Sequence, residues 1–129
     1  MVDKAAVRTD EAPAPFQGAP YSQAIRAGGL VFVSGQVGLA PGGNELLGDG
    51  IAEQTEQVFA NLRAILEAAG TGLDRIVKTT VYLRNLDDFQ AMNEVYRKHA
   101  GDVPPARATV EVSALPSGAL IEIDAIALA

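Results

Sequence analysis

The sequence predicts an α+β domain of two layers, in which a mixed β-sheet carries two helices on one face. Two segments, 51–69 and 85–101, repeat their apolar residues every three or four positions, as amphipathic helices do. The segments around them are rich in Val, Ile and Thr and alternate with a period of two, as strands do. The resulting order is two strands, helix, strand, helix, two strands, and the chain of 129 residues is sized for one such domain.

The first part of the chain divides into a lead-in and a hairpin. Residues 1–14 are polar and rich in Ala and Pro, so we expect a poorly ordered extension, with a single domain over residues 15–129. A strand over about Gln23–Ala27, a turn at Gly28-Gly29 and a strand over Leu30–Ser34 then form the predicted hairpin.

The two helices have recognisable ends. Asp49 is the expected N-cap of the first helix, and Gly70 is the expected glycine just past its last turn. After a strand in "DRIVKTTVYLR", the second helix buries Phe89, Met92 and Tyr96 on one side.

The end of the chain reads as a second hairpin, "ARATVEVSA" and "ALIEIDAIALA" joined by a turn at "LPSG". Because side chains alternate across a strand, Arg107, Thr109 and Glu111 share one face. That face is either solvated or an anion-binding site. One register of the hairpin places Glu111 opposite Glu122, and a slip of one residue separates them; the sequence leaves both open.

Composition excludes several classes of function. A net charge of −6 without a run of Lys or Arg argues against nucleic-acid binding. The absence of cysteine excludes disulfides and thiolate metal sites, and the one histidine, His99, is expected to be solvated near a helix end. No phosphate-binding or dinucleotide motif is present, so we expect neither a metal nor a cofactor. No apolar run approaches the roughly 20 residues of a membrane span and no signal-peptide core is found, so the expected location is cytoplasmic.

A few polar residues stand in apolar surroundings. Arg107 follows a proline pair, and a guanidinium binds a carboxylate with two parallel hydrogen bonds. Glu122 is flanked by Ile121 and Ile123, so it is either a desolvated carboxyl suited to carry a proton or the polar face of an alternating strand. Tyr21 is either a core aromatic or a hydroxyl at a strand entrance. Ser34-Gly35 is either a tight strand exit or a place where a ligand approaches the backbone.

Four stretches together resemble the RidA/YjgF family of reactive intermediate deaminases, also called translation-inhibitor L-PSP proteins. They are "GAPYSQAIRAGGLVFVSGQ", "QTEQVFANLRAILEAAG", "IVKTTVYLRNLDDFQAMNEVY" and "PPARATVEVSALPSGALIEIDAIA". The resemblance runs from about Pro15 to the C-terminus. It implies a chorismate-mutase-like fold, a homotrimer with clefts between subunits, and cofactor-independent hydrolysis of 2-imino acids to 2-keto acids and ammonia, the activity of a 2-iminobutanoate/2-iminopropanoate deaminase.

The resemblance also assigns roles. Arg107 corresponds to the family's carboxylate-binding arginine and Glu122 to its water-positioning glutamate. Thr109 stands where many members have cysteine, a departure that bears on pocket size and substrate preference. The other residues that the resemblance places in the cleft are Tyr21, which we group with the catalytic residues, and Ser34, Gly35 and Asn93, which we group with the substrate-binding ones.

Three alternatives stay open. The chain is a Rid-fold enzyme acting on another imine, or a protein that binds small carboxylates as a sensor without turnover, which would need only the arginine. RNA cleavage is the least supported, because the chain is acidic and lacks a basic stripe.

Overall fold

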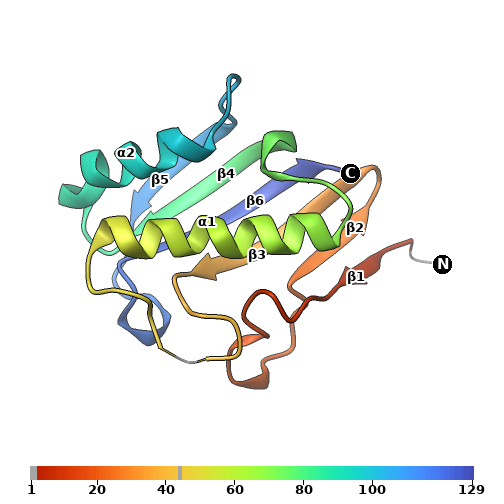
Figure 1. The fold of residues 1–129 in the computed structure, drawn as a ribbon, viewed down its shortest axis with the longest axis horizontal. Helices are drawn as coiled ribbons and strands as arrows, with labels where there is room; N and C mark the ends of the chain where they lie inside the picture. The colour runs from red at the N-terminus through yellow and green to blue at the C-terminus, as the bar shows by residue number, and fades with distance from the viewer. Residues whose placement is uncertain (1–2, 44) are drawn as a thin grey trace.

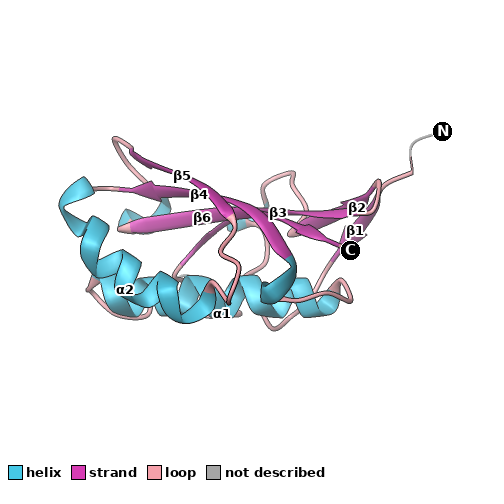
Figure 2. Cartoon of the chain, turned by 90° about the horizontal axis from the view of Figure 1, so that it is seen from above, coloured by secondary structure: helices cyan, strands magenta, loops and turns pink. Residues whose placement is uncertain are grey.

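A computed structural model describes residues 3–43 and 45–129 and shows one mixed six-stranded sheet with two helices packed on one face (Figures 1 and 2). The predicted α+β class is confirmed. The helices are α1 (Ile51–Ala68) and α2 (Phe89–His99). The strands are β1 (Ala5–Val7), β2 (Ala24–Ala27), β3 (Leu30–Val37), β4 (Ile76–Leu83), β5 (Ala106–Glu111) and β6 (Ile121–Leu128). They lie in the order β1-β2-β3-β6-β4-β5.

The core lies between the helices and the face of the sheet that they cover, which we call the helix face; the other is the open face (Figure 2). Alternation places every second strand residue in this core. Its fully buried side chains include Val31, Val81, Leu83, Ile121 and Ile123 from the sheet and Val58, Leu62, Ile65 and Leu66 from α1. None of the described helices is long and apolar enough to cross a membrane.

The N-terminal lead-in differs from the expected poorly ordered extension. Residues 5–7 form β1, which pairs antiparallel with β2 at one edge of the sheet. The buried Gln23 side chain accepts a hydrogen bond from the Thr9 amide (2.8 Å) and donates to the carbonyls of Thr9 (3.0 Å) and Pro13 (2.8 Å). A single buried amide thus satisfies several backbone groups of a segment that lacks an apolar pattern of its own.

The first hairpin forms as predicted, although β3 continues past Ser34 to Val37. Its turn residues Gly28 and Gly29 both have positive φ (59° and 79°), as the two-residue turn that suits strand twist requires.

The expected N-cap of α1 is wrong, because Gly50 occupies that position without a capping side chain. The expected end is confirmed: Gly70 has φ of 86°, and Thr71 N–H donates to Leu66 O at 2.9 Å.

The second predicted hairpin is wrong. β5 pairs in parallel with β4 at an edge, and β6 lies between β3 and β4, antiparallel to both. Burial explains this arrangement, because alternate residues of β6 are fully buried under the helices whereas Ala106, Ala108 and Val110 of β5 are exposed. The two glutamates therefore never face each other: Glu111 pairs with Leu83, and Glu122 with Tyr82.

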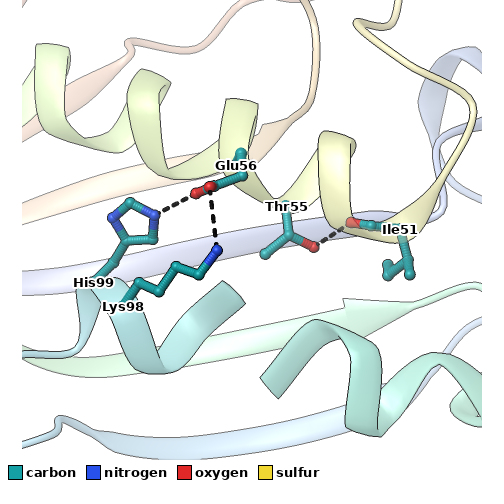
Figure 3. A network of polar contacts seen from close by, with 5 residues as sticks. All are labelled: Ile51, Thr55, Glu56, Lys98 and His99. Carbon is teal, nitrogen blue, oxygen red and sulfur yellow. Dashed lines mark hydrogen bonds and ion pairs between the residues drawn. The ribbon is translucent and has the colours of Figure 1, made fainter. Parts of the chain in front are cut away.

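His99, the last residue of α2, is not solvated as expected. Its ring stacks on Phe59 with centroids 4.6 Å apart, and its Nε2 contacts Glu56 Oε1. Figure 3 shows Glu56 of α1 in contact with both His99 and Lys98 of α2, and the neighbouring Thr55–Ile51 hydrogen bond within α1. The histidine therefore links the two helices.

Candidate functional site

Arg107 lies on edge strand β5 and faces the helix side of the sheet. It pairs with Thr79 of β4, which is 1% exposed beneath the helices, and paired residues share a face. Its guanidinium carbon lies 4.7 Å from the ring centroid of Tyr96 and 5.5 Å from that of Phe89, both on α2. These distances are those of cation–π contacts. The Tyr96 hydroxyl is fixed in turn by Thr79 Oγ1 at 2.7 Å.

The Arg107 side chain lines a surface hollow of about 310 Å³ between α2 and the loop that precedes β5. We call it the Arg107 hollow; its lining is Asn93, Tyr96, Arg97, Ala100, Gly101, Pro104, Pro105 and Arg107. Among the described residues no carboxylate forms an ion pair with Arg107. A half-buried guanidinium with aromatic neighbours and no protein counterion is suited to bind an anion from outside.

Asn93 and Thr109 lie close to Arg107 in different ways. Asn93 is half-buried on α2 and lines the Arg107 hollow. Thr109 follows Arg107 by two residues on β5, so it shares the same face without lining the hollow. The sequence prediction grouped both with Arg107, and the structure keeps them on its side of the sheet.

Glu122 lies on the opposite, open face of the sheet. It is half-buried in β6, between Ile121 and Ile123, which point into the core. Burial, and then the charge of Asp124, raise the pKa of the Glu122 carboxyl above its ordinary value. A carboxyl with a raised pKa exchanges a proton more readily near neutral pH.

Gly35 allows the Glu122 side chain to lie directly over β3. A Cβ atom at position 35 would come 2.7 Å from Glu122 Cδ, which is closer than real contacts allow. The absence of a side chain at position 35 therefore leaves the space that the carboxyl group occupies. This is the close approach to backbone that the Ser34-Gly35 pair suggested, made here by a side chain of the same protein.

A second hollow, of about 410 Å³, opens beside this carboxyl, and we call it the Glu122 hollow. Its lining is Pro13, Ala14, Phe16, Ala19, Tyr21, Ser34, Gly35, Gln36, Val37, Leu39, Pro116 and Glu122. The Tyr21 hydroxyl accepts a hydrogen bond from the Phe16 amide at 2.6 Å, which leaves its own proton for donation. The Ser34 hydroxyl donates to Ser22 O at 2.6 Å, so only its lone pairs can meet a ligand.

The structure therefore divides the predicted site residues into two groups. Tyr21, Ser34, Gly35 and Glu122 line one hollow, and Arg107 and Asn93 line the other. The two groups lie on opposite faces of the sheet, and β4 separates β5 from β6. Within one chain a small ligand bound to Arg107 does not reach Glu122.

Sequence reasoning missed two contributions to these hollows. The rings of Phe89 and Tyr96 hold Arg107, although the sequence placed them only in the core; their spacing of seven on one helix face was the available signal. The stretch from Pro13 to Ala19 walls the Glu122 hollow, and nothing in its composition points there.

No group of three or more His, Asp or Glu side chains in the described part of the chain is arranged to hold a metal ion. The arrangement present offers a cation for a carboxylate, a proton-exchanging carboxyl, and hydroxyls beside it.

Comparison with known proteins places this geometry in context. A family model described as Endoribonuclease L-PSP matches residues 9–129. A RutC family protein of Pyrococcus horikoshii is 49% identical over 124 residues, which are 96% of this chain and 97% of that protein. A Mus musculus protein named 2-iminobutanoate/2-iminopropanoate deaminase is 43% identical over 122 residues, covering 95% and 89% of the two chains. A crystal structure of a Rid family protein of unknown function from Yersinia pestis is similar with a TM-score of 0.92, at 43% identity and 98% and 99% coverage.

Proposed function

Because the chain belongs to the RidA/YjgF family, we propose that it hydrolyses reactive 2-imino acids to 2-keto acids and ammonia. The proposed activity is that of a 2-iminobutanoate/2-iminopropanoate deaminase, the name carried by the mouse relative. One observation carries the proposal: the Arg107 guanidinium lies against two aromatic rings at an open hollow with no carboxylate partner among the described residues. A 2-imino acid supplies that carboxylate, next to an electrophilic C=N carbon.

The reaction needs positioning and one proton carrier. Arg107 binds the substrate carboxylate through two parallel hydrogen bonds and thereby fixes the adjacent C=N carbon. Glu122, as the carboxylate, takes a proton from a water molecule as the water oxygen bonds to that carbon. Glu122 returns this proton to the imine nitrogen, which gives a carbinolamine. Glu122 then takes the hydroxyl proton and passes it to the same nitrogen, so that the C–N bond breaks as the C=O bond forms and ammonia leaves. Acid–base help of this kind contributes about 10²- to 10⁴-fold.

In the proposal the substrate lies between two copies of the chain, in a homotrimer, with Arg107 from one copy and Glu122 from the next. The support is the placement of the two groups on opposite faces, since no single chain offers both. The open face also exposes large apolar side chains that a second copy would cover, among them Phe32 (42% exposed) and Val110 (42%).

The remaining residues take supporting roles in the proposed cleft. The Tyr21 hydroxyl donates to the substrate or the attacking water, and the lone pairs of Ser34 accept from it. Gly35 leaves the space in which the Glu122 carboxyl lies. Asn93 and Thr109 border the carboxylate side, where the bulk of Thr109 shapes preference among imines.

The experiment is an imine-hydrolysis assay. An amino-acid oxidase generates 2-iminopropanoate or 2-iminobutanoate, and semicarbazide traps whatever is not hydrolysed. Wild type, Arg107→Ala and Glu122→Gln are compared at matched concentration. We expect wild type to divert the imine from the trap and both variants to lose that effect.

Two outcomes would contradict the proposal. If folded wild type does not compete with the trap but binds 2-keto acids through Arg107, the protein is a sensor without turnover. If it hydrolyses only other imines from a wider panel, the reaction class holds and the substrate is wrong.

A further inference from the structure

Two more polar groups lie beside Glu122 on the open face, and the proposed mechanism does not use them. Tyr82 of β4 donates a hydrogen bond from its hydroxyl to Asp124 Oδ2 at 3.0 Å. Both side chains are half-buried. A tyrosine–carboxylate bond on the outer face of a sheet is not needed by the core, which lies on the other side.

The sheet register brings this pair next to Glu122. Tyr82 is the direct cross-strand partner of Glu122, and Asp124 follows Glu122 by two residues on the same strand. All three side chains therefore share one face. The charge of Asp124 adds to burial in raising the pKa of Glu122. Burial, the bond to Asp124, and the charges of Asp124 and Glu122 raise the pKa of Tyr82 in the same way.

The other groups around Glu122 are uncharged side chains and two cations, Lys78 and the exposed Arg84, which lies two residues beyond Tyr82. From β3 come Ser34 and Gly35, which carry no charge, and from the segment before β2 comes the Tyr21 phenol. Lys78, farther along β4, donates its ammonium hydrogen bonds to Thr79 O (3.2 Å) and Thr80 Oγ1 (3.3 Å). No ion pair to Asp124 forms among the described residues.

We infer that Asp124, oriented by the hydroxyl of Tyr82, is a positioning residue that holds Glu122 ready to take up and return the proton of imine hydrolysis. This inference rests on the proposed function. Asp124 acts through Glu122 and does not touch the substrate. The negative charge of Asp124 makes Glu122 a stronger base. The hydrogen bond from the Tyr82 hydroxyl holds the Asp124 carboxylate against the open face of the sheet.

The alternative is that the Tyr82–Asp124 bond serves only to stabilise the sheet. Asp124→Asn separates the two roles, because asparagine keeps an oxygen that accepts from Tyr82 and loses only the charge. Glu67→Gln is the matched control, since Glu67 is an exposed carboxylate on α1, away from the site, and its loss changes the net charge equally.

The first measurement is a pH titration of the Glu122 carboxyl carbon by ¹³C NMR, with the signal assigned through Glu122→Gln. It needs no substrate. We expect the Glu122 midpoint to move to lower pH in Asp124→Asn and to stay in Glu67→Gln. We expect a smaller move in the same direction in Tyr82→Phe, where the released carboxylate turns toward water. An unmoved midpoint in Asp124→Asn overturns the inference, and an unmoved midpoint in Tyr82→Phe removes Tyr82 from it.

The second measurement is the pH profile of kcat/KM for 2-iminopropanoate hydrolysis. In Asp124→Asn the acid limb should move to lower pH and the plateau should fall by about two- to tenfold, as expected for a weaker base. KM at the plateau should stay unchanged, because Arg107 still binds the carboxylate. A lowered plateau with an unmoved limb indicates a structural role and overturns the inference.

The two measurements keep the two claims apart. If wild type hydrolyses no imine while the NMR midpoint still moves, the proposed function is wrong and the coupling between Asp124 and Glu122 stands. If wild type is active, and Asp124→Asn moves neither the Glu122 midpoint nor the acid limb of kcat/KM, the proposed function stands and the role of Asp124 is wrong.

Discussion

The Arg107 hollow and the Glu122 hollow place a charged group by different physical means. Arg107 lies against the rings of Phe89 and Tyr96 on α2, and the Tyr96 ring packs edge-on against Phe59 of α1. Glu122 lies on the open face, where no helix covers it, and its carboxyl occupies the space that a side chain at Gly35 would fill. The cation is thus positioned by regular secondary structure and the carboxyl by one close approach. This difference suggests that the binding group tolerates change around it better than the proton carrier does.

Among substitutions that keep the charge of the side chain, the largest effect is expected at Arg107. Arg107→Lys should lower kcat/KM for 2-iminopropanoate by about 10²- to 10³-fold, because an ammonium can neither form the paired hydrogen bonds nor stack flat on Tyr96. Arg63→Ala, an exposed arginine on α1, is the control and should match wild type. Full activity in Arg107→Lys would mean that the hollow supplies only a diffuse positive charge.

The next prediction tests whether the two hollows act together across a subunit boundary. Arg107→Ala and Glu122→Gln should each be inactive, yet a mixture unfolded and refolded together should regain activity. In mixed trimers from equal amounts, about a quarter of the clefts receive both wild-type groups. Steady-state rates before and after refolding measure the gain. A mixture that stays inactive, although mass spectrometry shows mixed oligomers, would place both groups in the same chain's site.

The two hollows also show what the sequence could and could not predict. Alternation in "ARATVEV" places Arg107 and Thr109 on one face, and the apolar neighbours of Glu122 signal a half-buried carboxyl; both features are local. The relation between the strands is not local. "LPSG" resembles a hairpin turn, yet β6 inserts between β3 and β4 because its alternate residues must lie beneath the helices. Without that register, nothing in the sequence shows that Arg107 and Glu122 point to opposite faces.

The N-terminal segment teaches the same lesson. Its strand, Ala5–Val7, carries no pattern that favours strand over coil, and its place depends on pairing with β2 and on the side chain of Gln23, which is distant in sequence. A segment that is ordered by one buried side-chain amide has no periodic apolar pattern in its own sequence. The helices, whose apolar stripes repeat over many residues, were predictable: α1 almost to both ends, and α2 except for its start, because a 3-10 turn over Leu86–Asp88 precedes it.

A smaller effect should follow from filling the space over β3. Gly35→Ala introduces a Cβ that must displace the Glu122 carboxyl, so kcat should fall by about tenfold while KM changes little. Gly43→Ala is the matched control, because a Cβ there meets its nearest neighbour at an ordinary 3.7 Å. Equal kcat values for the two variants would show that the position of Glu122 does not limit the reaction.

The smallest effect concerns stability, and its sign follows from the raised pKa of Glu122. Between the ordinary carboxyl pKa and the raised one, the folded protein binds more protons than the unfolded chain, so stability falls as pH rises through this window and stays lower above it. Glu122→Gln removes this loss. The variant should therefore melt a few degrees above wild type at about pH 8, and the difference should vanish below about pH 4.

Thermal unfolding at both pH values and one fixed protein concentration measures this difference, with Glu67→Gln as the charge-matched control. A gain confined to Glu122→Gln and to the higher pH would mean that the half-buried carboxyl is kept at a cost to stability, as expected of a group retained for its chemistry. A lower melting temperature in Glu122→Gln at pH 8 would instead identify Glu122 as a stabilising contact. The Glu122 hollow would then differ from the Arg107 hollow only in how its charged group is placed, and the carboxyl would carry no cost to stability.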